Sequence, residues 1–343
     1  MLVKDKNFEI FCGTGGVGKT TLATARAVYL SSIGKRVLLI TIDPSKRLKE
    51  ILSLKEEDAG LVSTVKNPWK TQYSFDALLM NPTKTMESIA SVSGVQEITT
   101  NRILKILSKP YGGLNEILSI IELDLNFKTD KYDVIILDTP PGAHFMDFLE
   151  SCSKIKSFFD KSFMEIFNYL GKRVGRKKPG ILKIVVTSGV KRLLRYLKKV
   201  TGAQFIDDFI DAISAFHLAK GPFLNGIKIQ EKLKDPELSN WFLVTSVEQD
   251  KFSEALEIRT HAKDFFHEDT YLLVNKSLSR MWDSFNSSNP TIEQIKNTTV
   301  NREKVIKELV QKKFKNILFF DEVIKSKPID HVISLTENWG LKV

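Results

Sequence analysis

Short apolar runs alternate with amphipathic stretches along most of this chain. Runs of consecutive apolar residues predict buried strands, and apolar residues that recur every three or four positions predict helices. The predicted strands span residues 8–12, 35–42, 73–80, 132–137, 241–246, 270–274 and 316–320, with helical patterns between most of them. Strands that alternate with helices predict an α/β fold built on a doubly wound, mainly parallel sheet.

A glycine-rich loop joins the first predicted strand to the first helix. Its glycines allow consecutive backbone N–H groups to turn toward phosphate oxygens without obstruction by a Cβ atom. In such a P-loop, or Walker A motif, Lys19 would hold the β- and γ-phosphates and Thr20 would ligate Mg²⁺, while the helix start adds a positive dipole end. The predicted nucleotide-binding residues are Gly13, Thr14, Gly15, Gly16, Val17, Gly18, Lys19, Thr20 and Thr21.

Two aspartates directly follow predicted strands, Asp43 after 35–42 and Asp138 after 132–137. A P-loop needs a carboxylate that reaches the Mg²⁺ shell from another strand, and doubly wound sheets bind ligands at the carboxyl ends of their strands. We therefore predict Thr20, Asp43 and Asp138 as the metal residues, with Asp43 orienting the attacking water or contacting the metal indirectly. Either aspartate has a structural alternative, because a capping role would also place it at the end of a strand.

Helical periodicity dominates the middle of the chain, from about residue 145 to 233. We expect a single P-loop ATPase domain over residues 1–343, with a helical insertion at 150–240 between two strands. Residues 45–70 predict a short helix followed by an irregular connection. No internal repeat or low-complexity tract interrupts this organisation.

The charge of the chain is concentrated in one segment. The chain has 51 basic and 41 acidic residues, a net charge of +10. Between residues 166 and 206 there are 11 basic residues and no acidic ones, so the remaining 40 basic residues nearly balance the 41 acidic ones. The imbalance is therefore a local surface property of the predicted insertion.

Two patterns in the insertion favour an interaction surface. Apolar residues from Ile155 to Leu170 recur at helical spacing, either as a packed stripe or as a groove for a hydrophobic client. Residues 191–200 place leucines on one helical face and five cations on the other. Through the basic residues 172–199 the chain could meet an anionic membrane surface or an acidic protein, or these residues form a solvated helix face. Nucleic acid is the weaker candidate, because few aromatic residues accompany the cations.

Few other features restrict the class of protein. No apolar run approaches the roughly 18 residues that span a bilayer, and the first strand begins too early to leave room for a signal peptide. The two cysteines, Cys12 and Cys152, form no C-x-x-C pair, so neither zinc nor a disulfide framework is indicated. We expect a cytoplasmic protein.

Three segments of the chain form a recognisable combination: the loop at 13–20, Asp43-Pro44, and the run Asp138-Thr139-Pro140-Pro141-Gly142-Ala143-His144. Together they resemble the arsenical-pump and tail-anchored-protein-targeting ATPases, which belong to the deviant Walker A class. The resemblance implies ATP and Mg²⁺ as cofactors, switch roles for Asp43 and Asp138, and an adenine contact from Asn275. It also implies a homodimer, with the nucleotide requirement for dimerisation left open, and a client protein of unknown identity. His144 is an open case, since a helix-start histidine commonly packs on its neighbours.

The chain departs from this family pattern in two ways. Position 14 is threonine, where the family has an additional lysine that reaches the partner subunit's nucleotide. The arsenite-binding cysteines and the zinc-binding C-x-x-C are also absent, which argues against arsenite transport and a zinc-clamped dimer. A GTPase is disfavoured as well, because Asn275-Lys276-Ser277 is followed by Leu278 instead of the aspartate that would bind guanine.

The sequence as a whole predicts a Mg²⁺-dependent ATPase that couples its nucleotide state to a partner or client through the basic helical insertion. Two alternatives stay open. Thr14 favours an ATP-dependent scaffold that does not hydrolyse, and the cations at 172–199 favour a partition-like ATPase that binds DNA non-specifically.

Overall fold

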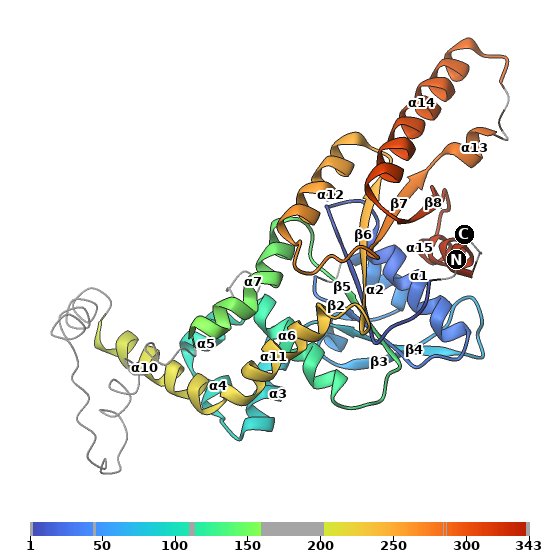
Figure 1. The fold of residues 1–343 in the computed structure, drawn as a ribbon. Helices are drawn as coiled ribbons and strands as arrows, with labels where there is room; N and C mark the ends of the chain where they lie inside the picture. Colours follow the sequence, from blue (N-terminus) through green and yellow to red (C-terminus); the bar gives the residue numbers. More distant parts are fainter. Residues whose placement is uncertain are drawn as a thin grey trace. The chain divides into compact units, whose positions relative to one another are not determined.

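The described strands form one sheet in which β1 (Phe8–Gly13) lies between β5 (Val134–Asp138) and β6 (Ser239–Ser246). The structure is a computed structural model that describes residues 3–43, 46–109, 114–158, 202–283, 285 and 287–340. Within these residues eight strands lie in the order β3-β4-β2-β5-β1-β6-β7-β8 (Figure 1). The other strands are β2 (Val37–Thr41), β3 (Val62–Lys66), β4 (Ser74–Leu79), β7 (Tyr271–Ser277) and β8 (Asn316–Asp321). All neighbouring pairs are parallel except β3–β4, which confirms the predicted α/β sheet.

The edge strand β3 corrects one expectation. The irregular connection expected within residues 45–70 is wrong over Val62–Lys66, which pairs antiparallel with β4. The side chains of β3 alternate between exposed and half-buried positions, so the segment lacks the apolar run of a central strand. Segment 62–66 is a strand because it pairs with β4, which follows it in the sequence, and this pairing is not visible in the apolar pattern of the segment itself.

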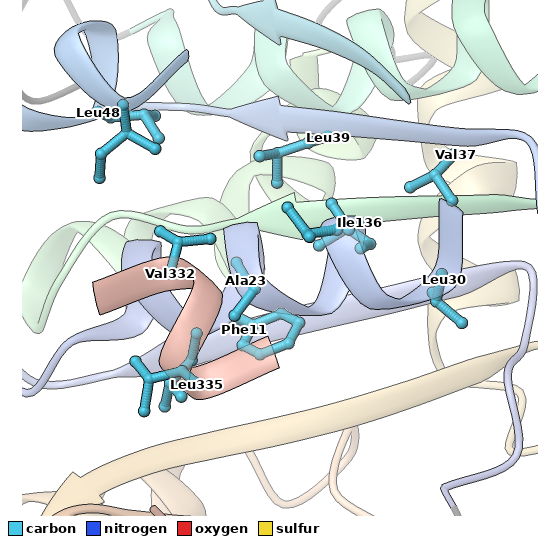
Figure 2. Packing of buried hydrophobic residues seen from close by; sticks show 14 of the residues in the cluster. Phe11, Ala23, Leu30, Val37, Leu39, Leu48, Ile136, Val332 and Leu335 are labelled. Atoms are coloured by element: carbon cyan, nitrogen blue, oxygen red, sulfur yellow. The ribbon is translucent and has the colours of Figure 1, made fainter. Parts of the chain in front are cut away.

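One face of the sheet is covered by α1 (Lys19–Ser32) and α15 (Pro328–Gly340), the first and last helices of the described chain. Figure 2 shows Ala23 and Leu30 of α1 and Val332 and Leu335 of α15 packed near Phe11, Leu39 and Ile136 of three strands. Side chains alternate between the two faces of a strand, so the residues of β1, β2 and β5 that face α1 contribute to this cluster, namely Phe11, Val37, Leu39, Val134 and Ile136. The cluster anchors the helix that follows the glycine loop.

Aromatic residues fill the opposite face of the same sheet. Trp241 of β6 is buried and makes edge-on ring contacts with Phe145, Phe265 and Phe266. Its indole N–H donates to the backbone oxygen of Leu233 at 2.8 Å. Burial on both faces is typical of parallel strands and explains their almost uninterrupted apolar sequences.

The chain divides into two compact units. The sheet unit comprises Met1–Met80, Asn126–Leu149 and Glu231–Val343, and the helical unit comprises Asn81–Leu125 and Glu150–Gln230. The single domain with an insertion at 150–240 stays a prediction. The structure adds that the helical residues described between β4 and β5, up to Leu125, belong to the same unit as α10 (Ala203–Leu218).

The remaining helices have the following bounds. In the sheet unit they are α2 (Lys46–Leu52), the 3₁₀ helix η1 (Glu56–Asp58), α12 (Gln249–His261), α13 (Ser279–Asp283) and α14 (Pro290–Lys313). The helical unit contains α3 (Pro82–Ser93), α4 (Glu97–Thr100), α5 (Arg102–Leu107) and α10 (Ala203–Leu218). Three helices, α6 (Asn115–Phe127), α7 (Ala143–Phe158) and α11 (Lys220–Leu233), begin in one unit and end in the other.

Two predicted surfaces fall outside the description. Residues 159–201 lie outside the described residues, and with them the basic segment 172–199 and most of the apolar stripe from Ile155 to Leu170. Among the helices that the structure does describe, none combines the length and apolar composition required to cross a bilayer.

Candidate nucleotide site

The loop between β1 and α1 is built from backbone conformations that favour glycine. Gly13, Gly16 and Gly18 have φ angles of 146°, 78° and 94°. A Cβ atom on Gly13 would lie 2.2 Å from the backbone oxygen of Val244, and one on Gly18 would lie 2.3 Å from the Asn275 amide nitrogen. The space above Gly16 is open to 4 Å. The loop therefore packs closely against Val244 and Asn275 at Gly13 and Gly18 and is open at Gly16, which suits a loop whose backbone binds phosphate.

Lys19, the first residue of α1, is buried and folds back over this loop. Its ammonium nitrogen donates to the backbone oxygen of Thr14 at 2.8 Å. Burial lowers the pKa of Lys19, and the negative charges of Asp138 and Asp43 act in the opposite direction. A partly desolvated cation at the start of a helix is well suited to attract a polyanion.

Asp138 and Thr20 meet beside the loop, although 118 residues separate them in the chain. The Thr20 hydroxyl donates to Oδ2 of Asp138 at 2.7 Å. The other carboxylate oxygen, Oδ1, is buried without a hydrogen-bond partner. A hydroxyl and a carboxylate are oxygen ligands of the kind that Mg²⁺ prefers, so this pair fits the predicted cation.

The environment of Asp138 leads to a testable pH dependence. Burial raises the pKa of Asp138 from 3.8 to about 7, although the hydrogen bond from Thr20 and the charge of Lys19 oppose the shift. Between these values the folded carboxyl retains a proton that the unfolded chain releases. Its contribution to stability is therefore present at low pH, falls as the pH rises through this window, and is level above about pH 7.

We expect Asp138→Asn to reduce the loss of thermal stability between about pH 5 and about pH 7.5, measured as Tm without nucleotide or Mg²⁺. Asp133→Asn is the matched control. Hydrogen bonds from Arg36 lower the pKa of Asp133, so it is ionised in both states across that range. An unchanged dependence of Tm on pH in Asp138→Asn would contradict the assignment of the proton to this carboxyl.

The two remaining predicted site residues, Asp43 and Asn275, differ in their exposure to solvent. Asp43 follows β2 and is exposed, and its charge raises the pKa of Asp138. Asn275, near the end of β7, is buried and donates its amide hydrogen to the backbone oxygen of Val17 at 2.9 Å. The following residue, Lys276, has a φ of 62°, and the pairing of β7 with β8 is irregular there. Asn275 thus supports the loop from behind, while its predicted contact with adenine stays a prediction.

Two hollows adjoin the loop, and Gly16, Gly18 and Thr21 line both of them. One, of about 260 Å³, is completed by Lys19, Thr20, Leu48 and Ile51. The other, of about 190 Å³, is completed by Asn275, Lys276, Asp321, Glu322, Val323, His331 and Leu335. The loop therefore adjoins one hollow that contains Lys19 and Thr20, the residues predicted to bind phosphate and Mg²⁺, and another hollow with both polar and apolar walls.

One polar residue near the loop is not predicted from the sequence. The hydroxyl of Thr41, the last residue of β2, is buried without a hydrogen-bond partner, as is the hydroxyl of Thr14, which is a predicted nucleotide-binding residue. A hydroxyl at the end of an apolar strand, two residues before Asp43, is the sequence signal that could have identified Thr41. No cluster of three or more His, Cys, Asp or Glu suited to a metal ion occurs in the described ranges.

One family model matches most of the chain. The family model described as anion-transporting ATPase matches residues 6–329, nearly the whole chain. The match includes the glycine loop, both aspartates and Asn275.

Individual relatives match over shorter stretches. A protein of Aquifex aeolicus (strain VF5) whose name places it among arsenical pump-driving ATPases is 27% identical over 173 residues, 45% of this chain and 40% of that protein. ATPase GET3 of Mycosarcoma maydis is 28% identical over 163 residues, 48% of this chain and 46% of the relative. ATPase get3 of Aspergillus terreus is 29% identical over 145 residues, 40% of this chain and 41% of the relative. The matched part of this chain thus spans less than half the length of each of these relatives.

Proposed function

Because the chain belongs to the anion-transporting ATPase family, we propose that it binds ATP with Mg²⁺ at residues 13–21 and hydrolyses it. The observation that carries the proposal is the contact of Thr20 with the buried carboxylate of Asp138, directly beside a loop that accepts no side chain at Gly13 or Gly18. Glycine backbone, lysine, hydroxyl and carboxylate are the groups that phosphoryl transfer requires around a metal–triphosphate complex.

The residues of the site would have the following roles. Backbone N–H groups of the loop and the ammonium of Lys19 would bind the phosphates. Thr20 and Asp138 would hold Mg²⁺, which neutralises charge on the phosphate oxygens when it is bound. Asp43, exposed at the end of β2, would orient the attacking water. Lys19 leaves the Thr14 oxygen when it turns to the phosphates, so one hydrogen bond within the loop is exchanged for bonds to the ligand.

The hollow of about 190 Å³ beside Asn275 is where we place the nucleoside. A carboxamide offers an acceptor oxygen as well as donors, which complements the exocyclic amine of adenine. Leu278 stands where a guanine-specific site would have a carboxylate, so we propose ATP in preference to GTP.

Titration with a fluorescent ATP analogue, with and without Mg²⁺, tests this proposal directly. We expect saturable binding that Mg²⁺ strengthens and that unlabelled ATP displaces at lower concentration than GTP does. No binding in the presence of Mg²⁺ would refute the proposed function.

We further propose that the nucleotide state reaches a partner or client protein through the helical unit. Residues 139–142 connect Asp138 to α7, and the Thr139 hydroxyl donates to the backbone oxygen of Phe11 in β1 at 2.9 Å. Since α7 begins in the sheet unit and ends in the helical unit, a shift at Asp138 has a continuous helix to follow. The homodimer expected from the sequence remains part of this proposal.

Hydrogen exchange measures such coupling. We expect peptides from α10 and α11 to change their protection when ATP and Mg²⁺ bind, with Lys19→Ala as the variant in which the change is lost. Changes confined to residues 13–21 and 138–142 would show that the nucleotide signal ends at the site.

A further inference from the structure

Thr41 lies next to Asp138 at the carboxyl edge of the sheet. The two residues are register partners in the parallel pair β2–β5. Residues two positions apart in a strand lie on the same face, so Thr41 shares a face with Leu39 and Val37. Asp138 likewise shares a face with Ile136 and Val134. These four apolar residues all belong to the cluster that packs against α1. Thr41 and Asp138 therefore lie on the same face, the one on which Thr20 of α1 contacts Asp138.

Both partners of this register pair carry an unsatisfied polar atom. Thr41 is 1% exposed and Asp138 is 2% exposed. The hydroxyl oxygen of Thr41 and Oδ1 of Asp138 are buried without hydrogen bonds, whereas the backbone oxygen of Thr41 accepts from Met80 at 2.9 Å. Leaving a buried polar group unpaired costs about 1–3 kcal/mol. Two such groups on adjacent strands indicate a site that is completed by something polar.

We propose that Thr41 is a positioning residue of the Mg²⁺ site, where its hydroxyl and Oδ1 of Asp138 together hold the hydration shell of the ion. The inference rests on the proposed function. Mg²⁺ gives up its waters reluctantly and usually keeps several of them, so a site for it needs partners for water as well as direct ligands. A hydroxyl has one donor and two acceptor positions, which allows it to bind a water and a carboxylate at once. Such indirect partners of a metal are known to tune its affinity.

The test separates this role from a structural one, because the two predict opposite effects of the same substitution. Thr41→Val keeps the shape of the side chain and removes the hydroxyl. We expect the Tm of the ligand-free protein to stay equal or rise, since an unpaired buried group disappears. The Mg²⁺ concentration for half-maximal strengthening of fluorescent ATP-analogue binding should rise about 10- to 100-fold. Binding without Mg²⁺ should be unchanged.

Two further variants complete the design. Thr41→Ser retains the hydroxyl and should restore the Mg²⁺ response, and Thr41→Ala removes the hydroxyl by a second route in case the valine variant does not fold. A wild-type Mg²⁺ response in Thr41→Val or Thr41→Ala would overturn the inference and assign the hydroxyl to a structural water. Equal loss of binding with and without Mg²⁺ would also overturn it. Absence of nucleotide binding in the wild type is a different result, because it refutes the proposed function itself.

Discussion

Replacing Lys19 by methionine is expected to lower the rate of ATP hydrolysis by about 10²- to 10³-fold, the usual loss when one group that stabilises transition-state charge is removed. Lys19 is buried, and its ammonium reaches back over the loop to the Thr14 oxygen. Position 14 is a buried threonine and supplies no second positive charge to the loop. The site therefore depends strongly on the charge of Lys19.

The fold should tolerate this change. Burial already lowers the pKa of Lys19, so methionine removes a desolvated cation and retains most of the apolar stem. Lys35→Met is the matched control, because Lys35 precedes β2 at the opposite edge of the sheet and pairs with Asp5. The test measures steady-state phosphate release and Tm for both variants, and we expect only Lys19→Met to lose hydrolysis while both keep a Tm close to that of the wild type. Wild-type turnover in Lys19→Met would mean that this loop is not the hydrolytic site.

The sequence predicts the glycine loop and its two neighbouring strands well, because every relevant signal there is local. Alternating apolar residues end at Cys12, glycines follow, and a helical pattern begins at Lys19. Asp138 is recognisable for a similar reason, since it directly follows a run of four buried apolar residues. Topology then brings Asp138 to Thr20, because the carboxyl ends of parallel strands meet at one edge of the sheet.

Other contacts between distant segments leave no signal in the local pattern. Asn275 donates to Val17 across 258 residues of chain, next to the left-handed Lys276 and within the irregular pairing after Val274. Strand β3 is similarly hidden, because its side chains are exposed or half-buried and only its pairing with β4 makes it a strand. The apolar pattern of a segment indicates whether that segment is buried. It does not indicate which backbone group a buried amide such as Asn275 contacts, or which strand a largely exposed segment such as β3 pairs with.

The second large effect is expected at a buried ion pair under α1. Glu9 of β1 and Arg26 of α1 are both fully buried, and two hydrogen bonds of 2.8 Å join the carboxylate to the guanidinium. The guanidinium carbon also lies 5.0 Å from the centre of the Trp339 ring of α15. Burial lowers the pKa of Arg26, but the charge and hydrogen bonds of Glu9 outweigh it and the net shift is upward.

Removing one partner leaves the other charge buried and unpaired. We expect Glu9→Gln or Arg26→Met to lower the free energy of unfolding by about 3–5 kcal/mol, measured by urea denaturation. The double variant Glu9→Leu/Arg26→Met should recover most of this loss, because replacement of a buried pair by apolar residues is often nearly neutral.

The exposed pair Arg36–Asp133 provides the matched control. Its nitrogen–oxygen distance of 2.7 Å is close to that of the buried pair, but the Arg36 side chain is 59% exposed. Arg36→Met should therefore change stability little, since solvent screens the interaction. A loss in Glu9→Gln no larger than in Arg36→Met would contradict the buried-pair argument.

Because Glu9 and Arg26 join the strand before the glycine loop to the helix after it, the single variants should also weaken nucleotide binding, and the double variant should restore it. Loss of binding in the double variant at recovered stability would instead indicate that the pair itself sets the geometry of the loop.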